Sequence, residues 1–323
     1  MKRIVLGGIA LCTCALAAHA QTLLPACRSA QHAGRDSLRV ADSTAISLEQ
    51  RMDVQVSRSE NSDYIPAWHD MFTRVPGDWG RFVGDNFRVE RIPAIAGLAG
   101  LTAALIIADN ETWSSTNHFS NGSVGRRDVA DFFAELGNGR TVLALAGGFA
   151  IAGWTSDDNR ALRTASQLVE SYLACGITVQ VLKHITGRER PERRTRPRGK
   201  WDFFPNQAAY HRSVPKFDAF PSGHTAAAMA MVTVLIENYP EATWLKPVGY
   251  GVVGLVGFGL VAKGWHWYSD FPLAIVLGYQ FGKLAAHPEG VDVVKGDEQN
   301  STKLTVAPAF GVDGAGVTVA IQF

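Results

Sequence analysis

The stretch Phe220-Pro221-Ser222-Gly223-His224-Thr225 (FPSGHT) joins a polar, aromatic-rich segment to an apolar one at residues 224–239. Pro-Ser-Gly is typical of a turn, and the residues after it predict a helix. At a helix start the backbone N–H groups point outward and favour an anion. Ser222 adds a hydroxyl, Gly223 permits close approach of a ligand, and His224 lies in the first helical turn. The sequence therefore predicts an anion-binding turn that carries an ionisable group.

Further apolar stretches predict an all-α bundle of about six helices, rich in Gly and Ala residues that let helix backbones approach closely. The stretches are residues 92–108, 141–154, 164–183, 224–239, 247–263 and 271–285. A membrane span needs about 20 apolar residues, and only the first and fifth stretches come near that length. The third carries Gln167, Glu170 and Gln180. Two alternatives stay open: a soluble bundle, or spans that keep their polar groups inside the bundle.

The chain before this core has a different character. Residues 1–20 combine a basic start, an apolar run and Ala18-His19-Ala20, which is typical of a secretory signal peptide. An uncleaved anchor helix is the alternative. Residues 21–91 are polar and mixed, and we expect an N-terminal extension of short helices and loops. The core itself is predicted to cover residues 92–285.

The chain after the core, residues 286–323, is predicted to be a linker followed by a short β-hairpin. Every second residue at the end of the chain is apolar, which puts four side chains on one face of a predicted strand: Val317, Val319, Ile321 and Phe323. Asp313-Gly314 is a turn signal.

Composition excludes some classes of protein. Of the 323 residues 46% are hydrophobic, and the net charge of +1 argues against a dedicated nucleic-acid binder. Outside the predicted signal the chain has Cys27 and Cys175, which either pair in an exported protein or remain two thiols. With no CxxC motif or Cys/His cluster, the sequence predicts no metal site and no cofactor.

A second cluster, KHITGRERP at residues 183–191, closes an apolar helix with positive charge. Lys183 and Arg190 offer fixed cations, and arginine is suited to bidentate contact with phosphoryl oxygens. Seven basic residues lie between Arg188 and Lys200. Such a run is either a solvated face or the mouth of an anion-binding site.

A third cluster, GWHWYSD at residues 264–270, places Asp270 four residues after His266, about one helical turn away. A carboxylate there can keep one imidazole nitrogen protonated and leave the other as a nucleophile. With His224, the chain has two histidines for the two apical positions of a phosphorus centre. One would attack and the other would protonate the leaving oxygen.

In this order, K-x6-RP (Lys183 to Pro191), PSGH (Pro221 to His224) and H-x3-D (His266 to Asp270) resemble the type 2 phosphatidic acid phosphatase (PAP2) superfamily, which also contains vanadium haloperoxidases. The resemblance implies an all-helical core with the three motifs at one end. It implies that His266 forms a phosphohistidine, that Asp270 orients it, and that His224 is the acid and then the base. Lys183, Arg190, Ser222 and Gly223 would hold the phosphoryl oxygens, and no metal would be needed.

The third motif departs from the family pattern, which usually has Ser-Arg where this chain has Gly259 and Leu260. Lys263 lies three residues before His266, and its long side chain is a candidate phosphate-binding replacement. The alternative is a site with one cation fewer.

The sequence therefore predicts a metal-independent phosphatase that acts on phosphomonoesters or pyrophosphates. The aromatic residues near the motifs favour an amphiphilic substrate such as a lipid phosphate: Trp201, Phe203, Phe204, Phe217, Phe220, Trp265 and Trp267. We expect an exported protein on the periplasmic side of the cell envelope, membrane-associated or integral, with an undetermined oligomeric state. The alternatives are a vanadate-dependent haloperoxidase and a degenerate protein that only binds anionic lipid.

Overall fold

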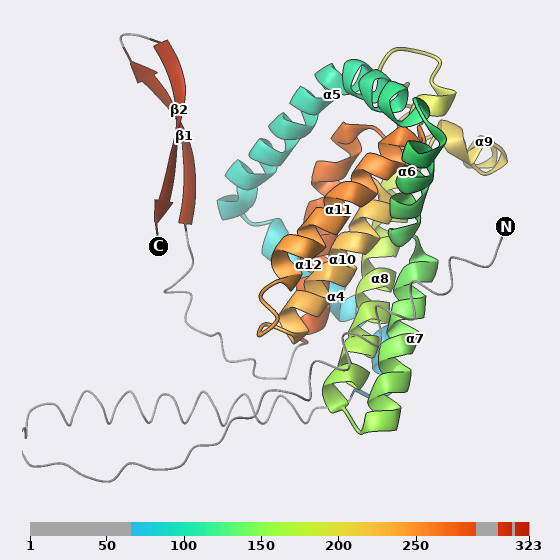
Figure 1. The fold of residues 1–323 in the computed structure, drawn as a ribbon, viewed down its shortest axis with the longest axis vertical. Coiled ribbons are helices and arrows are strands. Elements are labelled where there is room, and N and C mark those ends of the chain that lie inside the picture. Colours follow the sequence, from blue (N-terminus) through green and yellow to red (C-terminus); the bar gives the residue numbers. More distant parts are fainter. Residues whose placement is uncertain (1–65, 289–302, 312–313, 323) are drawn as a thin grey trace, which may run out of the picture. The chain divides into compact units, whose positions relative to one another are not determined.

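The computed structural model describes residues 66–288 and the strands at 303–311 and 314–322. The predicted signal peptide, most of the predicted extension and Cys27 lie outside these ranges. Residues 66–288 are dominated by helices (Figure 1). The α-helices are α3 (Asp70–Thr73), α4 (Val75–Asn86), α5 (Ile92–Asn121), α6 (Val124–Leu136), α7 (Gly139–Ser156), α8 (Asn159–Thr186), α9 (Gln207–Arg212), α10 (Gly223–Asn238), α11 (Leu245–Ala262) and α12 (Phe271–Ala286). Short 3-10 turns are η2 (Val89–Arg91), η3 (Pro191–Arg193), η4 (Val214–Lys216) and η5 (Tyr268–Asp270).

The predicted all-helical core is confirmed. Each of the six apolar stretches corresponds to one helix, namely α5, α7, α8, α10, α11 or α12. Helix α6 is an additional one. Its sequence VGRRDVADFFAEL has too many charges to stand out as apolar, but Ala130 and Ala134 are buried on one face.

Helix α10 lies at the centre of the bundle, where it contacts α7, α8, α11 and α12. Its apolar residues are buried around the whole helix, as expected for a core helix. A Cβ atom added at Gly278 of α12 would lie 2.3 Å from the Ala226 carbonyl oxygen. The bare glycine therefore allows α12 to pack directly on the backbone of α10, and this close packing brings the starts of the two helices together.

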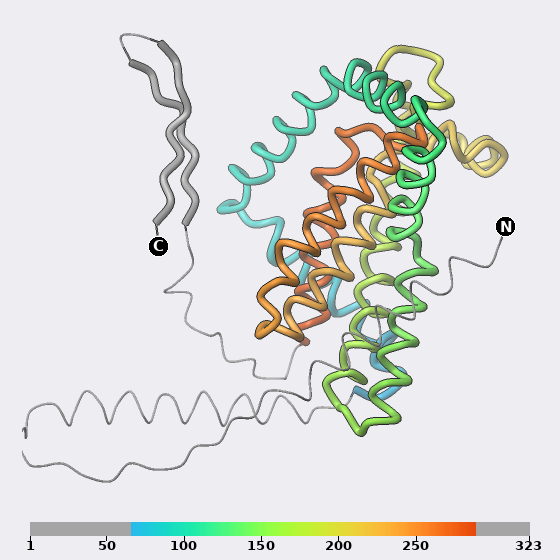
Figure 2. Tube along the Cα trace, viewed as in Figure 1, coloured from blue at the N-terminus to red at the C-terminus, as the bar shows by residue number. Residues whose placement is uncertain are grey.

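Helix α5 diverges from the bundle over its first half, as the traces show (Figures 1 and 2). Its second half contacts α6, α11 and η5. Within the described chain two segments are long and apolar enough to cross a membrane, Val89–Asn121 and Leu245–Ala262. In the most apolar window of the first segment only 6% of the residues are buried, against 44% in the second. The first is therefore an exposed apolar helix, whereas the second also serves the core.

Helices α3 and α4 precede the predicted core boundary at residue 92, yet they contact the bundle. The Trp79 indole N–H donates to the Ala174 carbonyl oxygen at 3.1 Å. The Arg81 guanidinium donates to the carbonyl oxygens of Leu284 and His287 at 2.8 and 2.6 Å. These bonds join α4 to α8 and to the end of α12.

The two strands at the C-terminal end, β1 (Lys303–Gly311) and β2 (Gly314–Gln322), pair antiparallel. Lys303 lies opposite Gln322 and Gly311 opposite Gly314. Only the backbone of these strands is described, so the predicted apolar face of Val317, Val319, Ile321 and Phe323 lies outside the described side chains. Cys175, in α8, is a free and buried thiol.

Candidate active site

The three motifs lie at one end of the bundle and are joined by hydrogen bonds. The first motif begins in the last turn of α8, the second lies at the start of α10, and the third lies in the loop and η5 turn before α12. The Thr186 hydroxyl donates to the Phe220 carbonyl oxygen at 2.8 Å, which joins the first two motifs. The Ser222 N–H donates to the Asp270 carbonyl oxygen at 3.1 Å, which joins the second and third.

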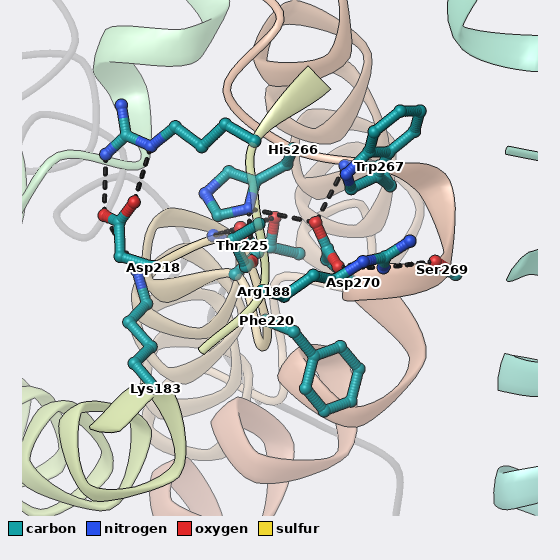
Figure 3. Close-up of polar contacts among 12 residues, drawn as sticks. Lys183, Arg188, Asp218, Phe220, Thr225, His266, Trp267, Ser269 and Asp270 are labelled. Atoms are coloured by element: carbon teal, nitrogen blue, oxygen red, sulfur yellow. Dashed lines mark hydrogen bonds and ion pairs between the residues drawn. The ribbon is translucent and has the colours of Figure 1, made fainter. Parts of the chain in front are cut away.

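His266 is held by its Nδ1 atom, 2.7 Å from the Ala219 carbonyl oxygen and 3.3 Å from Asp270 Oδ2 (Figure 3). A carbonyl oxygen can only accept a hydrogen bond, so this contact assigns the hydrogen to Nδ1. Nε2 then carries the free lone pair, as a nucleophile requires. Burial lowers the pKa of His266 although Asp270 opposes the shift, so the ring is neutral at pH 7. The sequence identified Asp270 as the orienting group but not the shorter bond to Ala219.

Asp270 is fully buried, and both of its carboxylate oxygens have donors. Oδ2 accepts from the Trp267 backbone N–H at 2.8 Å, and Oδ1 accepts from the Arg188 guanidinium. Asp270 is also the N-cap residue of α12. Its carboxylate is thus fixed on two sides before it meets His266.

Arg188 is a site residue that the sequence did not single out. It is 0% exposed and donates to Ser269 Oγ and to Asp109 Oδ2, both at 2.6 Å, besides Asp270. Asp109 also accepts from the Ser269 backbone N–H at 3.2 Å. These bonds tie α5 to the third motif. In the sequence Arg188 is one of seven similar basic residues, and only the isolated acid Asp109 at the end of an apolar stretch signals a buried partner.

The two phosphate-binding cations predicted in the first motif converge on another residue that the sequence did not single out, Asp218. Arg190 donates to both Asp218 carboxylate oxygens, from Nε at 2.7 Å and from a terminal nitrogen at 2.6 Å. Lys183 Nζ lies 3.7 Å from Asp218 Oδ2, and an added Cβ at Gly223 would lie 3.9 Å from the same Nζ. Lys183 therefore lies between Asp218 and the start of α10.

At the start of α10, the Ser222 hydroxyl is used as the helix cap. It accepts from the Thr225 N–H at 3.3 Å and lies 3.0 Å from the Thr225 hydroxyl, and Ser222 is 0% exposed. The N–H groups of Gly223 and His224, in the first turn, have no acceptor inside the helix. Backbone donors, rather than the Ser222 hydroxyl, are thus the groups best placed for an anion.

His224 lies beside this turn, with its ring centroid 5.8 Å from that of Trp265. Burial, together with the nearby His266, Lys183 and Arg190, lowers the pKa of His224 to about 3. The site as it stands therefore holds two neutral imidazoles beside Lys183 and Arg190. Burial lowers the pKa of Lys183, and the nearby Asp218 carboxylate opposes that shift. Among the described residues, no group of three or more His, Cys, Asp or Glu side chains is placed to hold a metal ion.

The stretch of chain that carries the three motifs matches a known family. The PAP2 superfamily model matches residues 164–288, which contain all three motifs. This part of the chain belongs to the PAP2 superfamily.

Two individual proteins are similar to parts of this chain, one in sequence and one in structure. Lipid A 1-phosphatase from Porphyromonas gingivalis is 32% identical over 68 residues, which is 21% of this chain and 15% of that protein. The chain thus matches only a small part of that relative's length. A crystal structure of the first transmembrane PAP2 type phosphatidylglycerolphosphate phosphatase, from Bacillus subtilis, aligns with a TM-score of 0.41 and 18% identity. The alignment covers 59% of this chain and 92% of that one.

The two positions at which the third motif departs from the PAP2 pattern, Gly259 and Leu260, lie on α11 and are buried. Leu260 is 0% exposed in an apolar cluster with Val256 and Ala134. Gly259 packs so closely on α6 that an added Cβ would lie 2.4 Å from the Ala130 carbonyl oxygen. Helix packing, rather than phosphate contact, accounts for both residues here.

Lys263, the predicted replacement cation, lies at the C-terminal end of α11. Its amine pairs with Asp131 Oδ1 at 2.9 Å and lies 4.5 Å from the centre of the Trp265 ring. With Asn117, Arg127 and other residues it lines a pocket of about 280 Å³ between α5, α6 and the end of α11. Phosphate contact by Lys263 stays a prediction, and it would require the amine to leave Asp131.

The predicted aromatic surroundings divide into two groups. Trp267 is fully buried, and its indole N–H donates to the Glu189 carbonyl oxygen at 2.9 Å. The Arg188 guanidinium lies over its ring, 5.4 Å from the ring centre, so Trp267 packs behind the site. Phe203 and Phe204, in the loop between the first and second motifs, are 64% and 74% exposed. They remain available to an apolar ligand.

Proposed function

We propose that this protein is a PAP2-type phosphatase that hydrolyses phosphomonoesters or pyrophosphates of amphiphilic substrates such as lipid phosphates. The observation that carries the proposal is the convergence of His266, with its free Nε2, and His224 on the cation pair Lys183 and Arg190. Together they fit a phosphoryl group.

In the proposed first step, Nε2 of His266 attacks phosphorus and the bond to the leaving oxygen breaks. Attack makes the imidazole cationic, and the Asp270 carboxylate beside Nδ1 stabilises that charge. The leaving alkoxide takes a proton from His224. In the second step His224, now neutral, accepts a proton from water, whose oxygen attacks the phosphohistidine and releases inorganic phosphate and neutral His266.

The negative charge that develops on the phosphoryl oxygens would be stabilised by Lys183, Arg190 and the first-turn N–H groups of α10. Removing one such transition-state contact typically costs about 10²–10³ in rate. Because His224 is neutral in the free site, its protonation must accompany substrate binding. A phosphate dianion provides the reason, since nearby negative charge favours the imidazolium.

Three observations support an amphiphilic substrate. Helix α5 exposes an apolar length that would be favourably buried in lipid. Phe203 and Phe204 expose large apolar side chains in the loop that leads from the first motif to the second. A relative that matches part of the chain is named lipid A 1-phosphatase.

We also propose that the protein is exported and works on the periplasmic side of a cell-envelope membrane. The signal-like residues 1–20 support export. N-terminal sequencing of the mature protein tests this part, with cleavage before Gln21 as the expected result. An intact N-terminus on protein recovered from the cytoplasm would refute it.

Hydrolysis is tested by release of inorganic phosphate from lipid phosphates and from p-nitrophenyl phosphate, with a metal chelator present. We expect turnover by the wild type and loss of about 10³-fold or more in His266→Ala. His118→Ala, an exposed histidine on α5, is the matched control and should keep full activity. Full activity in His266→Ala would refute the mechanism. Halide oxidation that appears only with vanadate would favour the haloperoxidase, and phosphate binding without turnover would favour a binding protein.

A further inference from the structure

Asp218 is the residue of the site for which the mechanism above has no use. It lies four residues before Ser222, in the loop that passes His266, and is only 6% exposed. In the proposed mechanism His266 is already the nucleophile and His224 already the proton donor. A buried carboxylate in a site built for an anion therefore requires its own explanation.

The carboxylate binds the cations that a phosphoryl group needs. Arg190 forms a two-bond fork with it, the geometry in which arginine also binds phosphate. Lys183 lies on the same side, directed toward Asp218 (Figure 3), at 3.7 Å. Burial opposes ionisation, but the bonds from Arg190 and the charge of Lys183 outweigh it and lower the pKa of Asp218, so the group is ionised at neutral pH.

The position of Asp218 also places it beside the reacting groups. The next residue, Ala219, supplies the carbonyl oxygen that holds His266 at 2.7 Å. The Ala219 N–H donates to the Arg188 carbonyl oxygen at 3.0 Å, so the backbone here is fixed from both sides. The Asp218 carboxylate is also near enough to His266 for the charges of the two side chains to interact.

We propose that Asp218 is an internal competitor for the phosphoryl group, which occupies Arg190 and Lys183 in the free enzyme and keeps the affinity for inorganic phosphate low. The inference rests on the proposed function and concerns the same site. A substrate keeps the contacts of its alcohol or lipid part, whereas free phosphate has only the cations. Asp218 therefore weakens product binding more than it weakens selection of the substrate, and favours release of phosphate.

The opposite role, in which Asp218 only orients Arg190, predicts the opposite sign. If the carboxylate competes, Asp218→Asn leaves one more uncompensated positive charge and binds phosphate more tightly. If it orients, the same change lets Arg190 move and weakens binding. The direction of the change therefore decides between the two roles.

The experiment measures binding of inorganic phosphate and of vanadate by calorimetry, and the inhibition constant of phosphate in the hydrolysis assay. We expect Asp218→Asn to lower the two dissociation constants and the inhibition constant about tenfold or more, as expected for removal of a unit charge close to the anion. Asp202→Asn, which removes a carboxylate paired with Lys200 at 3.4 Å in the same loop and 43% exposed, is the matched control and should change neither.

Asp218→Glu keeps the charge and should keep the weak binding, which separates charge from side-chain shape. If Asp218→Asn is unstable alone, phosphate should raise its Tm by more than it raises that of the wild type. Unchanged or weaker binding by Asp218→Asn overturns the proposal. Because calorimetry needs no turnover, this result is independent of whether the protein hydrolyses any of the tested esters.

Discussion

Arg188 provides a quantitative test of how the site is supported. Replacement by Met keeps an unbranched apolar chain but removes the charge that pairs with Asp109 and Asp270, all three side chains being 0% exposed. Breaking a buried pair by removing one partner costs about 3–5 kcal/mol, because a buried charge is left uncompensated. Here two carboxylates lose their common partner, so we expect a loss of stability at the upper end of that range.

The loss is measured as a shift of Tm of the purified protein. For a domain of this size, about 2–4 °C per kcal/mol applies, so a loss of about 5 kcal/mol in Arg188→Met should lower Tm by roughly 10–20 °C. Arg88→Met is the matched control, because Arg88 pairs with Asp85 at 3.2 Å while both side chains are more than half exposed. Such an exposed pair contributes at most about 1 kcal/mol.

Activity supplies the second measurement on Arg188→Met. Asp270 loses one of its two fixed donors, and misplacement of a catalytic group by about 1 Å can cost 10²-fold. We expect kcat to fall about 10²-fold with a smaller change in KM. Adding Asp109→Asn should recover part of the Tm, since it neutralises one of the two orphaned carboxylates. A Tm within the error of the Arg88→Met control, or a kcat within twofold of wild type, would refute this reasoning.

Three further outcomes are expected. Leu260→Arg, which restores the usual family residue, should lower Tm by several °C because the position is 0% exposed among apolar side chains; a gain in kcat without loss of Tm would show that the arginine reaches the phosphate instead. Gly259→Ala should cost about 1–3 kcal/mol in thermal unfolding, since its Cβ would lie 2.4 Å from a carbonyl oxygen of α6, whereas Gly254→Ala, with open space around it, should leave Tm unchanged or slightly raised. NMR titration should find the His224 ring neutral down to about pH 4. Added phosphate or vanadate should raise the pKa of His224, because the anion favours the imidazolium. If the bound anion does not raise this pKa, His224 is excluded as the proton donor.

Much of the architecture follows from local patterns along the chain. The six apolar stretches, the turn at Pro221-Ser222-Gly223 and the helix start at Asp270 depend on neighbours within a few residues. Burial of an apolar helix face and the capping of a helix are decided at that range. Helix α6 was not predicted, because its buried face consists of alanines between charged residues and alanine is only weakly hydrophobic.

The sequence by itself determined which residue types are available for phosphoryl chemistry and in what order. Only the tertiary structure decided what each cation does. Arg188, Arg190 and Lys263 have the same kind of charge, but their partners Asp109, Asp218 and Asp131 are 28 to 132 residues away. An ion pair depends on distance in space and on burial, and neither can be read from a basic run in a single sequence. Packing therefore pairs Arg188 with Asp270, pairs Arg190 with Asp218 in the proposed phosphate site, and pairs Lys263 with Asp131.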